Sequence, residues 1–355
     1  MCHNAPTMHC SSLPWWARIP LGRMIVLQPT PDNQHLPADA LDPTMVRDAQ
    51  SALLQWFERE GRDLPWRHTR DPYRILIAEV MLQQTQVDRV LPKYLEFIDA
   101  FPSADDLAAA PRSEVIRRWA PLGYNLRAVR LHQIAQQVVS EFDGEFPRTE
   151  AGLLALKGIG PYTAGAVMCF AYEQPSVFLD TNLRRVIGRC FASLPYPRTT
   201  DDKAILAMAE IALPRDTPWA WHQALMDLGA TVCAWAKPKC LLCPVNEWCR
   251  ARHDVGDKGY GTGDKESARV ATRIAEDVPV YRTQPKFAGS RRFYRGKIVG
   301  VLRGLASGDL IPLSELGLAI KADYTADDLP WLTEIVSGLA KDGLVVAGDG
   351  MVGLG

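Results

Sequence analysis

Four of the eight cysteines lie within 17 residues in the second half of the chain. They are Cys233, Cys240, Cys243 and Cys249. Disulfide frameworks spread their cysteines along a chain, whereas four thiolates at this density suit one metal ion or one inorganic cluster. The spacing leaves a zinc site and an iron-sulfur cluster equally open. Lys237 and Lys239 lie among the cysteines and predict a cationic loop suited to DNA phosphates.

A second pattern, Leu156–Ala164, contains two glycines one residue apart, followed by a proline. Gly158 and Gly160 allow a tight turn around Ile159, and Pro161 suits the first turn of a following helix. Backbone amides at such a turn bind a phosphate oxygen without reading base sequence. A plain turn between helices is the alternative interpretation, which the nearby cysteines make less attractive.

Two carboxyl groups have contrasting surroundings. Glu79 lies on the apolar face of a predicted helix over Tyr73–Phe101, so desolvation should raise its pKa and keep it protonated. Asp180 lies just before another predicted helix, where it should stay ionised, although helix capping alone would also explain it. An acid paired with a carboxylate is the pattern expected for acid-assisted cleavage of a glycosidic bond.

Polar residues near each carboxyl group extend this interpretation. Glutamines 83, 84 and 86 can pair with base edges or enter a base stack. Arg184, Arg185 and Arg189 follow Asp180 and predict a one-sided basic ridge for phosphates.

The elements that must position these residues are predicted to be helices. Apolar spacings of three and four recur from residue 45 to about 251, with short Pro or Gly breaks and no comparable period-two stretch. Residues 1–44 are expected to form a disordered extension and 253–285 a Gly-rich linker. Residues 286–355 predict helices followed by a hairpin around 348–350, as in a winged-helix-like unit. Its basic run, 291–297, is interpreted either as a DNA grip or as a solvated face.

Composition sets limits on the class of protein. The chain has 355 residues, 47% hydrophobic, with 40 Lys and Arg against 41 Asp and Glu. This excludes disorder over most of the length and makes any DNA-binding surface a local patch. No stretch is apolar and long enough for a membrane span or a signal peptide, so a cytoplasmic location and no membrane partner are expected.

Taken in order, these motifs resemble the MutY-type adenine DNA glycosylases of the helix-hairpin-helix, Gly/Pro-Asp superfamily. The motifs that carry the resemblance over about 45–252 are Leu64–Arg67, Glu79–Val87, Gly123–Tyr124, Leu156–Ala164, Leu179–Asn182, Met226–Ala230 and the four cysteines. The resemblance implies a mainly α fold in which two helical modules flank a cleft. A six-helix barrel with the helix-hairpin-helix would span 64–170, and an iron-sulfur module 45–63 with 171–252. The cysteines would then hold a 4Fe-4S cluster.

The same resemblance implies roles for individual residues. Glu79 would protonate the flipped adenine, and Asp180 would stabilise the oxocarbenium-like sugar and position water. Tyr162 and Asn182 would support them. Other residues would form the adenine pocket, the wedge and further DNA contacts, namely Trp66, Arg67, Leu82, Gln84 and Tyr124. Relatives that also cut the strand have a lysine where this chain has Tyr162, so a monofunctional hydrolase is expected.

Two departures from the family pattern limit the resemblance. Asn125 follows Tyr124 where the family usually has a second tyrosine. The family's Nudix-like C-terminal domain is not expected, because no histidine follows His253 to form its Phe-Ser-His loop. The predicted activity is removal of adenine opposite 8-oxoguanine or G by a monomer on duplex DNA. A thymine/uracil mismatch glycosylase and a non-catalytic DNA sensor are the alternatives.

Overall fold

The computed structural model describes residues 41–252 and 287–355, and the predicted linker 253–285 lies outside these ranges. Most of the predicted extension, 1–40, also lies outside them. Its last residues, however, belong to an ordered element, because helix α1 (Pro43–Glu60) begins two residues before the predicted boundary. The Asp42 side chain explains this start, since it accepts a hydrogen bond from the Thr44 amide at 2.8 Å.

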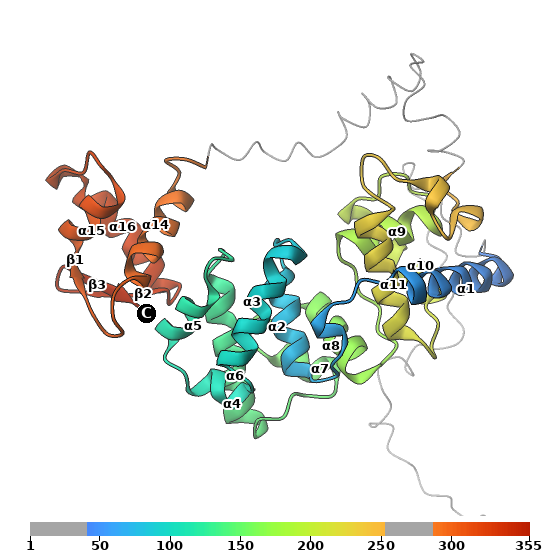
Figure 1. The fold of residues 1–355 in the computed structure, drawn as a ribbon, viewed down its shortest axis with the longest axis horizontal. Coiled ribbons are helices and arrows are strands. Elements are labelled where there is room, and N and C mark those ends of the chain that lie inside the picture. The colour runs from blue at the N-terminus through green and yellow to red at the C-terminus, as the bar shows by residue number, and fades with distance from the viewer. Residues whose placement is uncertain (1–40, 253–286) are drawn as a thin grey trace, which may run out of the picture. The chain divides into compact units, whose positions relative to one another are not determined.

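The predicted mainly α fold is confirmed (Figure 1). The remaining α-helices of the first described range are α2 (Pro72–Leu82), α3 (Val87–Ala100), α4 (Ala104–Ala109), α5 (Arg112–Trp119), α6 (Leu126–Phe142), α7 (Glu150–Ala155), α8 (Pro161–Tyr172), α9 (Thr181–Cys190), α10 (Asp202–Ala212) and α11 (Pro218–Thr231). No helix in the described parts of the chain is long and apolar enough to cross a membrane.

The single helix predicted over Tyr73–Phe101 is wrong, because the chain breaks between α2 and α3. Gln84, in the break, has a left-handed backbone with φ 56°. An uninterrupted helix cannot contain that conformation. The four residues from Gln83 to Gln86 therefore form a turn directly after the helix that carries Glu79.

Helices from distant parts of the sequence pack together around the later motifs. α1 packs against α11, α11 against α9, and α2 against α8. A buried ion network joins the first pair of helices, because Asp227 on α11 accepts hydrogen bonds from Arg62 and Arg67 just after α1. These contacts bring the ends of the first described range, 41–252, next to each other. The division into a barrel and an iron-sulfur module remains a prediction.

The C-terminal residues form the winged-helix-like unit predicted from the sequence. Its elements follow the order α14 (Arg291–Arg303), β1 (Ile311–Pro312), α15 (Leu313–Ile320), α16 (Leu329–Lys341), β2 (Val345–Gly348) and β3 (Met351–Leu354). The antiparallel sheet has the order β1-β3-β2, and Gly348 pairs with Met351 across the hairpin. Asp349 and Gly350 at the turn have φ values of 51° and 75°, as a two-residue type I′ turn requires.

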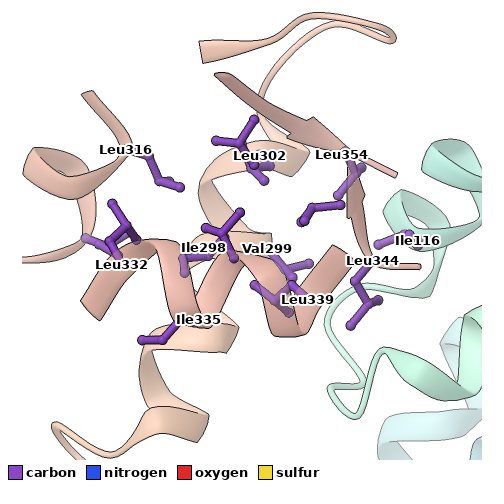
Figure 2. Close-up of a cluster of buried hydrophobic side chains, with 14 of the residues drawn as sticks. Ile116, Ile298, Val299, Leu302, Leu316, Leu332, Ile335, Leu339, Leu344 and Leu354 are labelled. Atoms are coloured by element: carbon purple, nitrogen blue, oxygen red, sulfur yellow. The ribbon is translucent and has the colours of Figure 1, made fainter. Parts of the chain in front are cut away.

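This C-terminal unit shares its apolar core with helices of the first described range. Ile116 on α5 belongs to the same buried cluster as Val299, Leu339 and Leu344 (Figure 2). Val129 on α6 belongs to that cluster as well. Polar contacts surround the cluster: Arg303 Nη2 donates to Asn125 Oδ1 at 2.7 Å, and Arg117 Nη2 donates to the Leu305 carbonyl at 2.9 Å. The C-terminal unit is therefore docked on α5 and α6.

The basic run on α14 is largely engaged within the C-terminal unit. Arg291 pairs with Glu334 on α16, and Arg295 pairs with Asp342 just after that helix. The Lys297 ammonium donates to the Ile320 carbonyl at 2.9 Å. These charges connect α14 to its neighbouring helices, and the interpretation of the run as a DNA grip remains a prediction.

Candidate active site

Glu79 lies in an apolar environment on α2, as its position in the sequence predicted. It is 6% exposed, and Ile75, one turn earlier, is also buried. Burial raises the pKa of Glu79 to about 7, and the nearby Asp180 carboxylate raises it further. The Tyr162 hydroxyl donates to Glu79 Oε2 at 2.8 Å, and this bond partly opposes the rise in pKa. Near neutral pH, Glu79 is therefore poised to give up a proton.

Tyr162 comes from the first turn of α8, directly after the glycine-rich turn. Its ring packs edge-on against Phe178, with the ring centroids 5.6 Å apart. Burial, with the negative charges of Glu79 and Asp180, raises the pKa of Tyr162 well above its ordinary value. The phenol thus stays protonated and acts as a hydrogen-bond donor to Glu79.

Asp180 caps α9, and its negative charge raises the pKa of both Glu79 and Tyr162, so the two predicted carboxyl groups act on the same site. Its Oδ1 accepts from the Leu183 amide at 2.6 Å, and its Oδ2 accepts from Asn182 Nδ2 at 3.3 Å. Burial raises the pKa of Asp180, contrary to the simple expectation for a helix cap, while these amides and Arg185 oppose the rise. Helix capping and a role in catalysis are compatible for Asp180. Oδ1 makes the short capping bond, whereas the Asn182 bond to Oδ2 is long.

Asn182 is held in place by Arg185, whose Nη2 donates to Asn182 Oδ1 at 2.7 Å and to the Gly229 carbonyl at 2.6 Å. Arg184 forms a bidentate ion pair with Asp202. Arg189 is 3% exposed and donates to backbone carbonyls, including Ala234 at 2.8 Å. The predicted one-sided basic ridge is therefore wrong, because these arginines connect elements of the protein.

The glycine-rich segment has the predicted turn geometry. Gly158 has φ 103°, which strongly favours glycine, and Ile159 is buried beneath the turn. Gly160 begins α8 without any side-chain cap, and a Cβ added there would meet no atom within 4 Å. The first amides of α8 therefore have room for a phosphate group.

The predicted wedge segment and the predicted DNA contact Tyr124 both expose side chains. Gln84 is exposed after the half-buried Leu82, in the turn that ends α2. Tyr124 is 58% exposed and has a left-handed backbone with φ 45°. Both residues hold unusual backbone conformations beside the helix of Glu79, and such strain is often found at functional positions.

Trp66 and Arg67, predicted for the adenine pocket, are both buried. The Arg67 guanidinium donates to Asp227 Oδ1 at 2.7 Å and Oδ2 at 2.9 Å, and to Gln223 Oε1 at 2.7 Å. The structure thus gives Arg67 a positioning contact with α11. The sequence alone suggested no role for Asp227, because the arginines that bind Asp227 lie some 160 residues earlier in the chain.

The four predicted cluster cysteines line a single cavity and form no disulfides. Arg189 Nη1 lies 3.4 Å from Cys233 Sγ, so a cation faces the thiols. Four thiols around one cavity are a donor set suited to a soft metal centre. Lys237 and Lys239 are exposed on the same loop.

Comparison with known proteins is consistent with this site. A family model described as HhH-GPD superfamily base excision DNA repair protein matches residues 77–212. An adenine DNA glycosylase of Mycolicibacterium smegmatis is 39% identical over 308 residues, covering 85% of this chain and 97% of that protein. A thymine/uracil-DNA glycosylase of Methanothermobacter thermautotrophicus is 36% identical over 200 residues, covering 56% and 90%.

Solved structures show the same fold. A thermostable thymine-DNA glycosylase, 33% identical, has a TM-score of 0.56 and covers 60% of this chain and 98% of that one. An endonuclease III trapped on DNA covers the same shares, with a TM-score of 0.51 at 23% identity. Fold and site define a base-excision DNA repair enzyme of the HhH-GPD superfamily. Within that superfamily, the chain belongs to the MutY-type adenine DNA glycosylase family.

Proposed function

We propose that this enzyme hydrolyses the N-glycosidic bond of adenine mispaired with 8-oxoguanine or G in duplex DNA, acting as a monomer. The main support is the pairing of Glu79, a desolvated acid, with Asp180, a second carboxyl group whose charge raises the pKa of Glu79. The adenine base would leave the stack and enter the site, since its glycosidic bond is otherwise out of reach.

Glu79 supplies the proton for the purine leaving group, and the Tyr162 phenol orients its carboxyl group. Asp180 offsets the positive charge that develops on the sugar, while Asn182 and the α9 amides fix its orientation. Water then forms a bond to the sugar C1′ in place of the departed adenine and gives its proton to the Asp180 carboxylate, which leaves an abasic site. Tyr162 carries no amine to attack the sugar, so the strand stays intact.

Cys233, Cys240, Cys243 and Cys249 would hold a 4Fe-4S cluster. The cluster would anchor the loop that presents Lys237 and Lys239 to the DNA backbone. Gly158 and Gly160 would bind a second phosphate through the amides at the start of α8. Both contacts are independent of base sequence, so they position the enzyme rather than choose its substrate.

Adenine is favoured over thymine or uracil by the extent of the match to the Mycolicibacterium smegmatis protein. That match covers 85% of the chain, which is more than residues 1–252 could account for. The similarity therefore continues into the C-terminal part. The thymine/uracil-DNA glycosylase match covers 56%.

A single-turnover assay tests the proposal on duplexes with adenine opposite 8-oxoguanine, adenine opposite G, and thymine or uracil opposite G. We expect adenine release and an alkali-labile abasic product with no strand cut. Asp180→Asn should keep DNA affinity and lose base release, while Asp216→Asn, at an exposed aspartate, should match wild type. Release of pyrimidine alone would refute adenine specificity, and no release of any base would support a DNA sensor.

A further inference from the structure

Arg127 is a buried arginine that the proposed chemistry does not use. It lies in the first turn of α6 and is 5% exposed. Its hydrogen-bond partners are backbone carbonyls and one threonine hydroxyl rather than a carboxylate. A buried cation in such surroundings is costly unless its hydrogen bonds are well made, so these contacts need an explanation.

One side of the guanidinium closes the end of the helix that carries Glu79. Nη1 donates to the carbonyls of Val80 and Met81, each at 2.9 Å, and to that of Gln83 at 2.5 Å. The last carbonyls of a helix have no partner within it, and a cation is favoured there. Arg127 therefore caps α2 from another helix.

The other amino group of Arg127 contacts the turn after α2 and the loop that exposes Tyr124. Nη2 donates to Thr85 Oγ1 at 3.1 Å, beside the exposed Gln84, and to the Gly123 carbonyl at 3.3 Å. The guanidinium carbon also lies 5.6 Å from the centre of the Tyr124 ring. One planar group thus connects the turn after α2 with the loop that exposes Tyr124.

The Tyr124 loop has further support on its other side. Trp119 Nε1 donates to the same Gly123 carbonyl at 2.9 Å. Asn125, next to Tyr124, accepts a hydrogen bond from Arg303 of the C-terminal unit. The loop is thus fixed on several sides, and Arg127 alone among these residues also holds the end of α2.

We propose that Arg127 is a positioning residue that holds the Gln84 turn and the Tyr124 loop at a fixed separation, so that both enter the duplex together as the target adenine leaves the stack. The inference rests on the proposed function, since it assigns a step of that reaction. Lysine would not replace arginine, because a point charge cannot span the carbonyls that the planar fork reaches.

The test uses the cluster-loaded full chain with Arg127→Lys and Arg127→Met. A 2-aminopurine next to the target adenine reports unstacking by fluorescence, and single-turnover rates report base release. On a duplex with adenine opposite 8-oxoguanine we expect both variants to lose about 10 to 100-fold in unstacking and release. On DNA whose adenine is already unstacked in a bulge, the loss should be about threefold or less.

The bulged substrate separates positioning from a general loss of structure, which would slow both substrates alike. Arg118→Lys is the matched control, because Arg118 is an exposed arginine on the neighbouring α5 that pairs with Glu114. If Arg127→Met does not fold, Thr85→Val takes its place in the test. This variant removes one of the same contacts and should slow adenine release from the duplex with 8-oxoguanine by about threefold or more.

Wild-type rates in folded Arg127 variants, or equal losses on the two substrates, would overturn the positioning role. Unchanged rates in Thr85→Val, where that variant is the one tested, would do the same. A wild-type enzyme that releases adenine from neither substrate would instead refute the proposed function, so the two failures are distinguishable.

Discussion

Removal of the Tyr162 hydroxyl should raise the pH at which the enzyme loses activity. The phenol donates to Glu79 Oε2 at 2.8 Å and lowers the pKa of that carboxyl group. In Tyr162→Phe the ionised form of Glu79 loses this donor, so its pKa should rise above about 7.

The size of the shift follows from the strength of the bond. A hydrogen bond to a charged group contributes about 1.5 to 3 kcal/mol. The phenol also binds the protonated carboxyl group, so about half of this difference should remain, which is roughly 1 pKa unit. Base release needs protonated Glu79, so the rate falls as pH rises through this pKa. At pH 8, the variant should retain about five times the fraction of its own maximal rate that wild type retains.

The assay is a single-turnover rate profile from about pH 5.5 to 9.5 on adenine opposite 8-oxoguanine. Each variant is compared with its own plateau, so a uniform loss of activity does not affect the midpoint. Tyr172→Phe is the matched control on the same helix, because the Tyr172 hydroxyl donates to the Phe146 carbonyl instead. A midpoint that stays in place or moves to lower pH in Tyr162→Phe would refute the reasoning.

Four further variants test the free energy of unfolding or the affinity for DNA. Glu79 stays protonated in the folded protein between its ordinary pKa of 4.5 and about 7. As pH rises through this range, the unfolding free energy of wild type should fall by about 3 kcal/mol relative to that of Glu79→Gln. An equal pH dependence of the two proteins in urea denaturation would contradict this. Gly158→Ala should cost about 1 to 3 kcal/mol in the same measurement because of its φ of 103°. Gly160→Ala should leave stability unchanged and weaken duplex affinity in a titration, and equal effects of the two alanines on stability would be evidence against the assigned turn. Asp227→Asn should lower the unfolding free energy by about 3 to 5 kcal/mol, since it leaves the buried Arg67 unpaired, and a loss below about 1 kcal/mol would show that the ion network is unimportant.

The desolvated acid was predictable from sequence because its cause is local. Glu79 occupies a mostly apolar helix, and the side chains around it on that helix are enough to predict burial and a raised pKa. The glycine-rich turn was predictable for the same reason, since Gly158 permits a positive φ and Pro161 fixes its own φ wherever these residues occur. The pairing of Glu79 with Asp180 was proposed from their contrasting surroundings, and the family resemblance then added a role for each carboxyl group.

Features set by distant partners were missed. The arginines after Asp180 looked like a DNA-facing ridge, yet Arg185 and Arg189 are buried against carbonyls some 45 residues later. The break after α2 was also missed, because helical spacing of apolar residues continues past it. Arg127 gave no signal, since its partners include the carbonyl of Val80, 47 residues earlier.

The shared core between the C-terminal unit and α5 and α6 bears on how this enzyme can be redesigned. A glycosylase shortened to end at residue 252 would present Ile116 and Val129 to water, so a minimal version needs polar replacements at both positions. The same two side chains mark where a transplanted lesion-reading domain must supply a matching apolar face (Figure 2). Such a graft would succeed or fail on the fit at that face, whatever the length of the segment that tethers it.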